Sequence, residues 1–218
     1  TAEGAARAAG RIGMPAQCMR FWPGWDQLKA HVESGTLGEL RSLTLRRQGS
    51  RPQWGAGFYA DAGRSGGALV DLHIHDADLI RWCLGDPQRV FCTGDRDHVS
   101  TAYLFDVGPV HVVAEGGWDH TPGFAFHMAY TAVFSGGTLD FALGREPALS
   151  LARDGELETV ELDPTSGYDG EVRHLLDVLA GKTTLRATLS EAAGLARLLD
   201  AESQSLASGT PITLGASS

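Results

Sequence analysis

The spacing of apolar positions divides the chain into segments of helical and extended character. Between residues 89 and 162, β-branched and aromatic residues alternate with polar ones, and turns rich in Gly, Asp and Pro separate the runs. Residues 39–48 show the same alternation. The short spacings between runs favour hairpins, and therefore a largely antiparallel sheet. The strands are predicted at residues 39–48, 90–94, 100–106, 110–116, 125–134, 138–142, 148–152 and 158–162.

A helical period of apolar residues flanks this region on both sides. It predicts helices at residues 4–12, 25–33, 68–84, 170–180 and 190–207, with a short strand at residues 15–21. Helices grouped before and after a run of strands indicate an α+β protein. We expect a large, open, mostly antiparallel sheet with helices on one face.

Segment 68–84 contains neither Pro nor Gly and is predicted to form one helix. At about 100° per residue, Asp71, His75, Asp78 and Trp82 fall on a narrow arc. Leucines fall on another arc, the one that faces a core. A carboxylate one turn before an imidazole can present an acid/base pair to a cleft. The alternative is a solvated helix face with a chance pair.

The same stretch reads G-G-A-L-x-D-x-x-x-H-x-x-D from Gly66 to Asp78. This pattern resembles the signature of the Gfo/Idh/MocA oxidoreductases, NAD(P)-dependent enzymes that act mostly on sugars and polyols. The resemblance implies that Asp71 and His75 line the substrate pocket, that the His acts in proton transfer, and that Asp78 helps to bind substrate. His73 stands where the family usually has a small residue, which leaves its role open.

Further similarity to the family follows in the right order along the chain, at residues 16–23, 34–40, 134–139 and 203–214. By family position, Arg20 contacts the cofactor; a structural ion pair is the alternative. The Gly-rich nucleotide loop and the Glu-Lys-Pro motif of the family are absent from these 218 residues. We therefore expect residues 1–22 to be a remnant of the dinucleotide-binding Rossmann domain, and residues 23–218 to form the α+β substrate-binding and oligomerisation domain.

Residues 51–65 form a loop rich in Gly and aromatic residues just before the signature. Its G-x-G-x-x-A run from Gly55 to Ala60 is not a phosphate loop, because no apolar strand precedes it and no helix start follows it. Arg51, Trp54 and Tyr59 are predicted to bind substrate, since aromatic faces stack on sugar rings and Arg can hold hydroxyl groups. A plain surface loop is the alternative.

Charge and cysteine content narrow the choice of partners. A net charge of −9 and a pI near 5.3 disfavour nucleic acid and anionic membranes as partners. No apolar run approaches the roughly 20 residues of a membrane span. Three scattered Cys favour a reducing, cytoplasmic compartment. No metal is predicted, since His73 and His75 diverge by about 200° on a helix and the other His show no specific spacing.

The resemblance implies an NAD(P)-dependent oxidoreductase acting on a sugar, a polyol or a related secondary alcohol. This chain would be its substrate-binding half, inactive alone, and NAD or NADP would serve the intact protein. The alternative is a non-catalytic sugar-binding or regulatory module. A sheet face rich in Val, Phe and Tyr should be covered, so a homo-oligomer formed through that face is expected.

Overall fold

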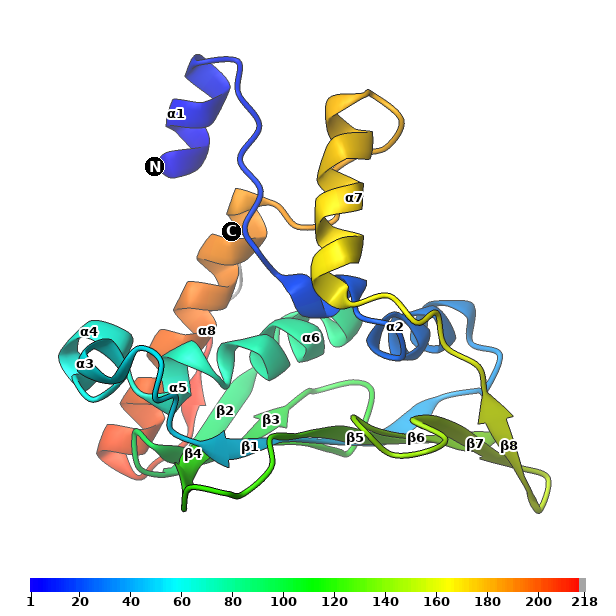
Figure 1. The fold of residues 1–218 in the computed structure, drawn as a ribbon. Coiled ribbons are helices and arrows are strands. Elements are labelled where there is room, and N and C mark those ends of the chain that lie inside the picture. Colours follow the sequence, from blue (N-terminus) through cyan, green and yellow to red (C-terminus); the bar gives the residue numbers. More distant parts are fainter. Residues whose placement is uncertain (216–218) are drawn as a thin grey trace.

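The computed structural model describes residues 1–215, and these contain one nine-stranded sheet in the order β8-β7-β6-β5-β1-β4-β3-β2-β9 (Figure 1). The central strands β1 and β4 pair in parallel, with Leu43 opposite Val112, and the other neighbours pair antiparallel. The strands are β1 Leu40–Ser50, β2 Arg89–Gly94, β3 His98–Leu104, β4 His111–His120, β5 His127–Phe134, β6 Gly137–Ala142, β7 Leu149–Arg153, β8 Glu156–Val160 and β9 Ile212–Thr213.

The helices lie on one face of this sheet (Figure 1). Helices α7 and α8 each begin with a capping box, formed by Ser166 with Asp169 and by Thr188 with Glu191. The helical elements are α1 Ala2–Ala8, the 3₁₀ helix η1 Cys18–Phe21, α2 Trp25–Ser34, α3 Ala56–Tyr59, α4 Ala62–Ser65, α5 Ala68–Asp71, α6 Ile74–Leu84, α7 Gly167–Leu179 and α8 Leu189–Ser208.

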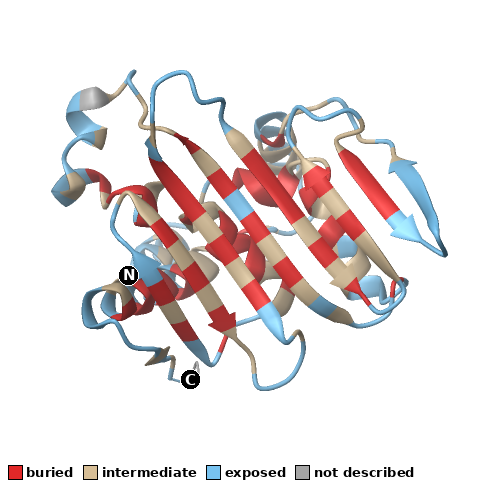
Figure 2. Ribbon diagram, turned by 90° about the horizontal axis from the view of Figure 1, so that it is seen from below, coloured by how far each residue is buried: buried red, intermediate tan, exposed pale blue. Residues whose placement is uncertain are grey.

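The core lies between the sheet and helices α2, α6 and α8. Alternate strand residues such as Leu45, Tyr130 and Phe141 are buried against Leu28 and Ile80 of the helices. The residues between them face the other way, and Figure 2 shows the resulting alternation of buried and more exposed positions. The expected α+β architecture is therefore confirmed, and the period of two in the sequence has its physical origin in this single covered face.

The sequence predicted that the uncovered face of the sheet is rich in Val, Phe and Tyr, and this prediction was wrong. The sheet tyrosines and several of its phenylalanines, among them Tyr103 and Phe134, are in the helix-facing core. On the strands, the positions between the buried ones carry smaller and charged side chains such as Thr44, Arg46 and Glu115. The large aromatic residues belong to the core because the helices supply the apolar partners that they need.

Two local predictions were also wrong. Residues 18–21 form a 3₁₀ helix in place of the expected strand, and all four residues of this helix are buried. Segment 68–84 is two helices, α5 and α6, because the N–H of His73 bonds to the carbonyl oxygen of Ala68 at 2.8 Å. That bond spans five residues where a regular α-helix spans four, and this wide turn ends α5.

The Gly-Gly pair before α5 has a steric reason. Gly66 and Gly67 have φ values of 77° and 75°, in the left-handed region. A Cβ on Gly67 would lie 2.4 Å from the carbonyl oxygen of Arg96, a backbone atom. This close approach positions α5 against the turn between β2 and β3, and so fixes the start of the signature segment.

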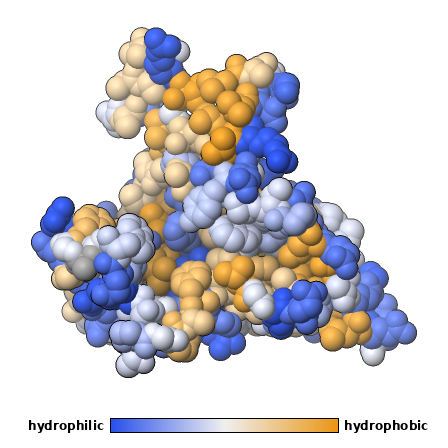
Figure 3. Space-filling view, in the orientation of Figure 1, coloured by the Kyte–Doolittle hydropathy of each residue, from blue (hydrophilic) through white to orange (hydrophobic). Residues whose placement is uncertain are grey.

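Helices α1 and α7 extend away from the sheet (Figure 1). Helix α1 has no buried residue. Helix α7 exposes an apolar stripe, with Tyr168, Val172, Leu176 and Leu179 each about 60% exposed. Figure 3 shows apolar side chains gathered over the upper part of this helix. Tyr168 packs edge-on against Trp22 at 5.8 Å, and the rest of the stripe faces solvent.

None of the helices within residues 1–215 combines the length and the apolar character that crossing a membrane requires.

Candidate functional site

His73 lies inside the molecule, where it joins α6 to α8 and the sheet. Its Nε2 lies 3.0 Å from Oε2 of Glu202 and 2.9 Å from the hydroxyl of Tyr103. Tyr103 also donates to Oε1 of Glu202 at 2.9 Å, and Thr101 donates to Oε2 at 3.3 Å. Burial lowers the pKa of His73, but the charge of Glu202, the hydrogen bond to it and the charge of Asp76 together outweigh burial, so the net shift is upward. These four buried side chains form a polar cluster that fixes α8 on the sheet.

Asp76, one turn further along α6, forms a second buried ion pair. Arg47 of β1 donates from Nη2 to Oδ1 of Asp76 at 2.8 Å and from Nε to Oδ2 at 3.1 Å. The guanidinium also lies 5.3 Å from the ring of Trp25. Asp76 is fully buried and Arg47 is 3% exposed. The pair therefore fixes α6 to the centre of the sheet by a fork of two bonds.

His75 lies between these two clusters in sequence and is only partly exposed. Its Nδ1 is enclosed and has no hydrogen-bond partner among the described residues. Burial and the charge of Arg47 lower the pKa of His75 to about 4. The imidazole is therefore neutral at pH 7 and able to accept a proton.

Asp71 does not pair with His75 within residues 1–215, because the wide turn at His73 separates their two helices. Desolvation raises the pKa of Asp71. Its charge instead acts on Tyr59, whose pKa is raised by desolvation and then by Asp71. The structure therefore places the Asp71 carboxylate beside the aromatic loop.

The loop residues predicted to bind substrate are grouped around Trp118 of β4. The Arg51 guanidinium lies 6.0 Å from the Trp118 ring, and Tyr59 contacts the same ring edge-on at 5.7 Å. Trp54 packs on Tyr59 at 4.9 Å and remains 84% exposed. Arg51 also pairs with Asp97, which accepts from Trp118 Nε1 at 2.7 Å. The cluster presents aromatic surface and hydrogen-bonding groups to solvent.

Arg20 and Asp78 of α6 form a further buried pair. Arg20 donates to both carboxylate oxygens of Asp78, at 2.8 and 2.9 Å, and each side chain is 1% exposed. A further nitrogen of Arg20 donates to Glu191 at 2.8 Å. Of the two roles left open for Arg20 by the sequence, the structure shows the ion pair. A role of Arg20 in cofactor binding, and of Asp78 in substrate binding, stays a prediction.

The model of the GFO/IDH/MocA C-terminal domain matches residues 25–138, more than half of the chain. The chain belongs to the Gfo/Idh/MocA family. Among curated relatives, D-xylose 1-dehydrogenase (NADP(+)) 2 of Haloferax volcanii is 26% identical over 94% of this chain and 66% of its own length. This Gfo/Idh/MocA chain therefore spans about two thirds of that relative.

Solved structures of dehydrogenases share the fold of this Gfo/Idh/MocA chain. Levoglucosan dehydrogenase in complex with NADH and levoglucosan has a TM-score of 0.78 at 18% identity, covering 94% of this chain and 66% of that one. The WlbA dehydrogenase from Bordetella pertussis, in complex with NADH and UDP-GlcNAcA, has a TM-score of 0.75 at 18% identity, covering 98% and 66%. At these identities the likeness establishes the fold.

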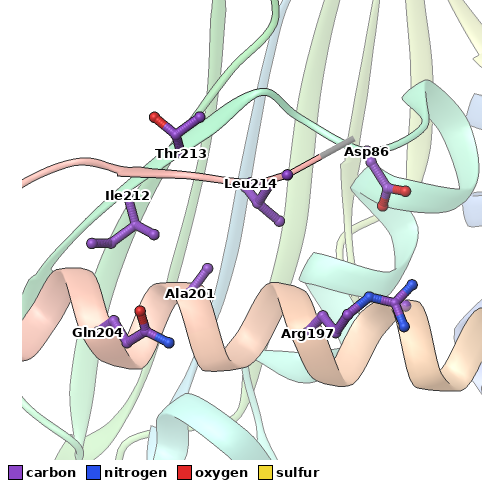
Figure 4. Close-up of a pocket in the computed structure, with 9 residues that line it drawn as sticks. Asp86, Arg197, Ala201, Gln204, Ile212, Thr213 and Leu214 are labelled. Atoms are coloured by element: carbon purple, nitrogen blue, oxygen red, sulfur yellow. The ribbon is translucent and has the colours of Figure 1, made fainter. Parts of the chain in front are cut away.

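A separate groove of this Gfo/Idh/MocA chain lies between α8 and β9, away from the signature segment. Figure 4 shows Arg197 and Gln204 on α8 opposite residues 212–214, of which Ile212 and Leu214 point toward the helix and Thr213 points away from it. The lining of the groove has no residue of the Gly66–Asp78 signature.

Several residues that shape the site were not foreseen from the sequence. Arg47, Glu202 and Tyr103 form buried polar contacts to the signature segment from β1, α8 and β3. A charged residue at a core-facing position of a strand is the one signal that could have singled out Arg47. Glu202 could have been singled out in the same way, because it is a charged residue among apolar residues of α8.

Proposed function

We propose that this chain is the substrate-binding part of an NAD(P)-dependent oxidoreductase that acts on a sugar, a polyol or a related secondary alcohol. Membership of the Gfo/Idh/MocA family supports the reaction class. A D-xylose dehydrogenase among the relatives and the levoglucosan complex among the solved structures support the substrate class. The observation that carries the proposal is the partly buried His75, neutral at pH 7 and with its Nδ1 unpartnered among the described residues, in the same signature segment as Asp71, whose charge acts on Tyr59 of the aromatic loop.

His75 acts as the proton acceptor. Oxidation of a secondary alcohol moves a hydride to the nicotinamide and requires removal of the hydroxyl proton. With a pKa of about 4, the His75 imidazole is neutral at pH 7 and has a free lone pair. Arg47 opposes the imidazolium that would form, so proton transfer from His75 to water or a further group completes the step.

The loop binds and orients the substrate. The exposed face of Trp54 offers a stacking surface for a sugar ring, and Tyr59 and Arg51 offer hydrogen-bond donors to its hydroxyl groups. Asp71 accepts hydrogen bonds from substrate hydroxyls. Desolvation and the charge of Asp71 raise the pKa of Tyr59 in the loop, so Asp71 positions the substrate and does not contact His75 directly.

The cofactor would be held by other parts of the whole protein. The guanidinium of Arg20 already donates hydrogen bonds to Asp78, Glu191 and the carbonyl oxygen of Arg186. A role of Arg20 in cofactor binding would therefore require it to exchange one of these partners. When bound, NAD or NADP would supply the hydride acceptor. We propose that residues 1–22 belong with the dinucleotide-binding part and that the exposed stripe of α7 packs against it.

A homo-oligomer formed through the uncovered sheet face belongs to the same proposal. Side chains on that face include small ones such as Thr44 and paired ones such as Asp140 with Arg145, so a second copy could pack closely on it. Val113→Arg, at the centre of this face, should shift the mass measured by light scattering towards the monomer. An unchanged mass would place the contact elsewhere.

The test of the function is made on the whole enzyme, with NAD and NADP and a panel of aldoses, polyols and anhydrosugars. His75→Ala should lower kcat by about 10²–10⁴-fold, the range for loss of a general acid/base. Trp54→Ala should mainly raise KM. His111→Ala, an exposed histidine on β4, is the matched control and should leave both constants unchanged.

The alternative, a sugar-binding module without catalysis, predicts binding of a sugar without turnover. It requires that the whole protein binds a sugar by calorimetry while turning over no member of the panel with either nucleotide. Turnover that survives His75→Ala at the wild-type rate would remove the proposed role of His75 and leave the family assignment intact.

A further inference from the structure

Three side chains of metal-ligand type meet where β3 begins and β4 ends. The nearest ligand atoms of His98, Asp119 and His120 all lie within 4.8 Å of one another. His98 Nδ1 lies 2.8 Å from Oδ1 of Asp119, and His120 Nδ1 lies 3.5 Å from the same oxygen. Ligands at 2.0–2.2 Å from a tetrahedral zinc ion are about 3.4 Å apart, so the spacing approaches that of a coordination shell.

The backbone explains how the three side chains converge. His98 pairs with Gly117 on β4, and its ring lies over that residue, where an added Cβ would be 2.6 Å from His98 Nδ1. Asp119 and His120 both pair with Ser50 of β1, which marks a bulge. Consecutive residues of a regular strand point to opposite faces, and a bulge re-aims one of them. The bulge therefore allows both Asp119 and His120 to approach His98.

The surroundings hold the two imidazoles in the orientation that a cation needs. His120 Nδ1 is enclosed and has no hydrogen-bond partner among the described residues, while its ring stacks on Phe124 at 4.2 Å. His98 Nε2 lies 3.0 Å from Oε1 of Glu115. A carboxylate on the far nitrogen of a ligating histidine fixes the tautomer that leaves the near nitrogen free, as in many metal sites.

We propose that His98 Nδ1, the Asp119 carboxylate and His120 Nδ1 bind one divalent transition-metal ion of the zinc type, with Glu115 as the outer partner of His98. Two imidazoles and one carboxylate suit zinc, cobalt or nickel better than calcium or magnesium, which prefer oxygen ligands alone. Three protein ligands leave a position for water. The proposal is independent of the proposed dehydrogenase activity, which uses none of these residues.

The site would act on the substrate loop through the neighbours of its ligands. Asp97 and Trp118 directly precede His98 and Asp119, and Trp118 donates to Asp97, which pairs with Arg51. An ion that joins β3 to β4 here would therefore also hold Arg51 in place. The metal is a structural tie at the edge of the proposed substrate site.

The experiment uses protein without a histidine tag, stripped with a chelator and then titrated with zinc in a calorimeter. Wild type should bind one equivalent, and zinc at 100 times the dissociation constant should raise the melting temperature by about 5–10 °C. Cobalt should bind at the same site and give a visible absorption band. His98→Ala and Asp119→Ala should abolish both signals, while Glu115→Gln should weaken zinc binding by about 10- to 100-fold.

The matched control is His111→Ala, which removes an exposed histidine from the same strand and should bind zinc as wild type does. Asp119 is half exposed, so its replacement is compatible with folding, which circular dichroism checks. A wild type that takes up no zinc, or whose uptake is equal in the Asp119→Ala variant, would overturn the proposal. In that case, His98 is held by hydrogen bonds to Glu115 and Asp119 alone.

Discussion

His73 Nε2 lies 3.0 Å from Oε2 of Glu202, and neither side chain has any exposed surface. The imidazole and the carboxylate hold α8 on the sheet as a buried pair. Neutralising one partner of such a pair destabilises the folded state, because the charge of the other partner is then buried without compensation. The stability of the fold should therefore depend on the protonation state of this one histidine.

Stability should fall as pH rises through the folded pKa of His73. That pKa is raised above the ordinary value, because burial, which lowers it, is outweighed by the charge and hydrogen bond of Glu202 together with the charge of Asp76. Below about pH 6.5 His73 is protonated in both states, and above it only the folded state keeps the proton. Urea unfolding of wild type and His73→Gln from pH 6 to 9 measures this. Curves that stay parallel would contradict the prediction.

His75 should act in the opposite direction, in acid. Its pKa is lowered to about 4 by burial and by Arg47, so between pH 6.5 and 4 only the unfolded chain takes up the proton. The stabilisation that the neutral imidazole allows is present above pH 6.5 and is lost as pH falls towards 4. His75→Gln should unfold less readily in this range than wild type does, as measured by thermal melts at pH 7, 6, 5 and 4.

Breaking the Arg47–Asp76 pair from one side should cost more than removing it altogether. Asp76→Leu leaves the guanidinium charge buried beside Trp25 and should lower the free energy of unfolding by about 3–5 kcal/mol. The double variant Arg47→Met with Asp76→Leu should recover most of that loss. Urea titrations of the two single variants and the double variant form the cycle. Losses that simply add would show that the two side chains do not act as a pair.

The three cysteines should be unreactive in the folded protein. All are buried, and desolvation raises the pKa of Cys83 to about 12 and that of Cys92 to about 11. The thiolate, which is the reactive form, is then scarce at pH 8. A colorimetric thiol reagent should label the native protein slowly and should label three groups after addition of guanidinium. Rapid labelling of the native protein would show that this part of the core opens easily.

The sequence predicted the strands well because one covered face imposes a strict period of two along each of them. The sequence prediction was wrong at residues 68–84. The wide turn at His73 that divides this segment into two helices contains neither Gly nor Pro, so the pattern of apolar residues does not reveal it. The prediction also missed the partners of the signature residues. Asp76 of that segment is paired with Arg47, which lies 29 residues away in the sequence. Pairings of that range depend on the topology of the sheet, which periodicity does not encode.

The parallel pairing of β1 with β4 has a consequence for synthesis on the ribosome. Strand β1 emerges first, but both of its neighbours, β4 and β5, come from residues 111–134. At ordinary translation rates, about 4–17 s pass between the synthesis of β1 and that of both strands that pair with its edges. During that delay the chain exposes an unpaired strand whose core-facing side carries Leu43, Leu45 and Arg47. The buried arginine thus interrupts a run that would otherwise be apolar, at the stage when aggregation competes with folding.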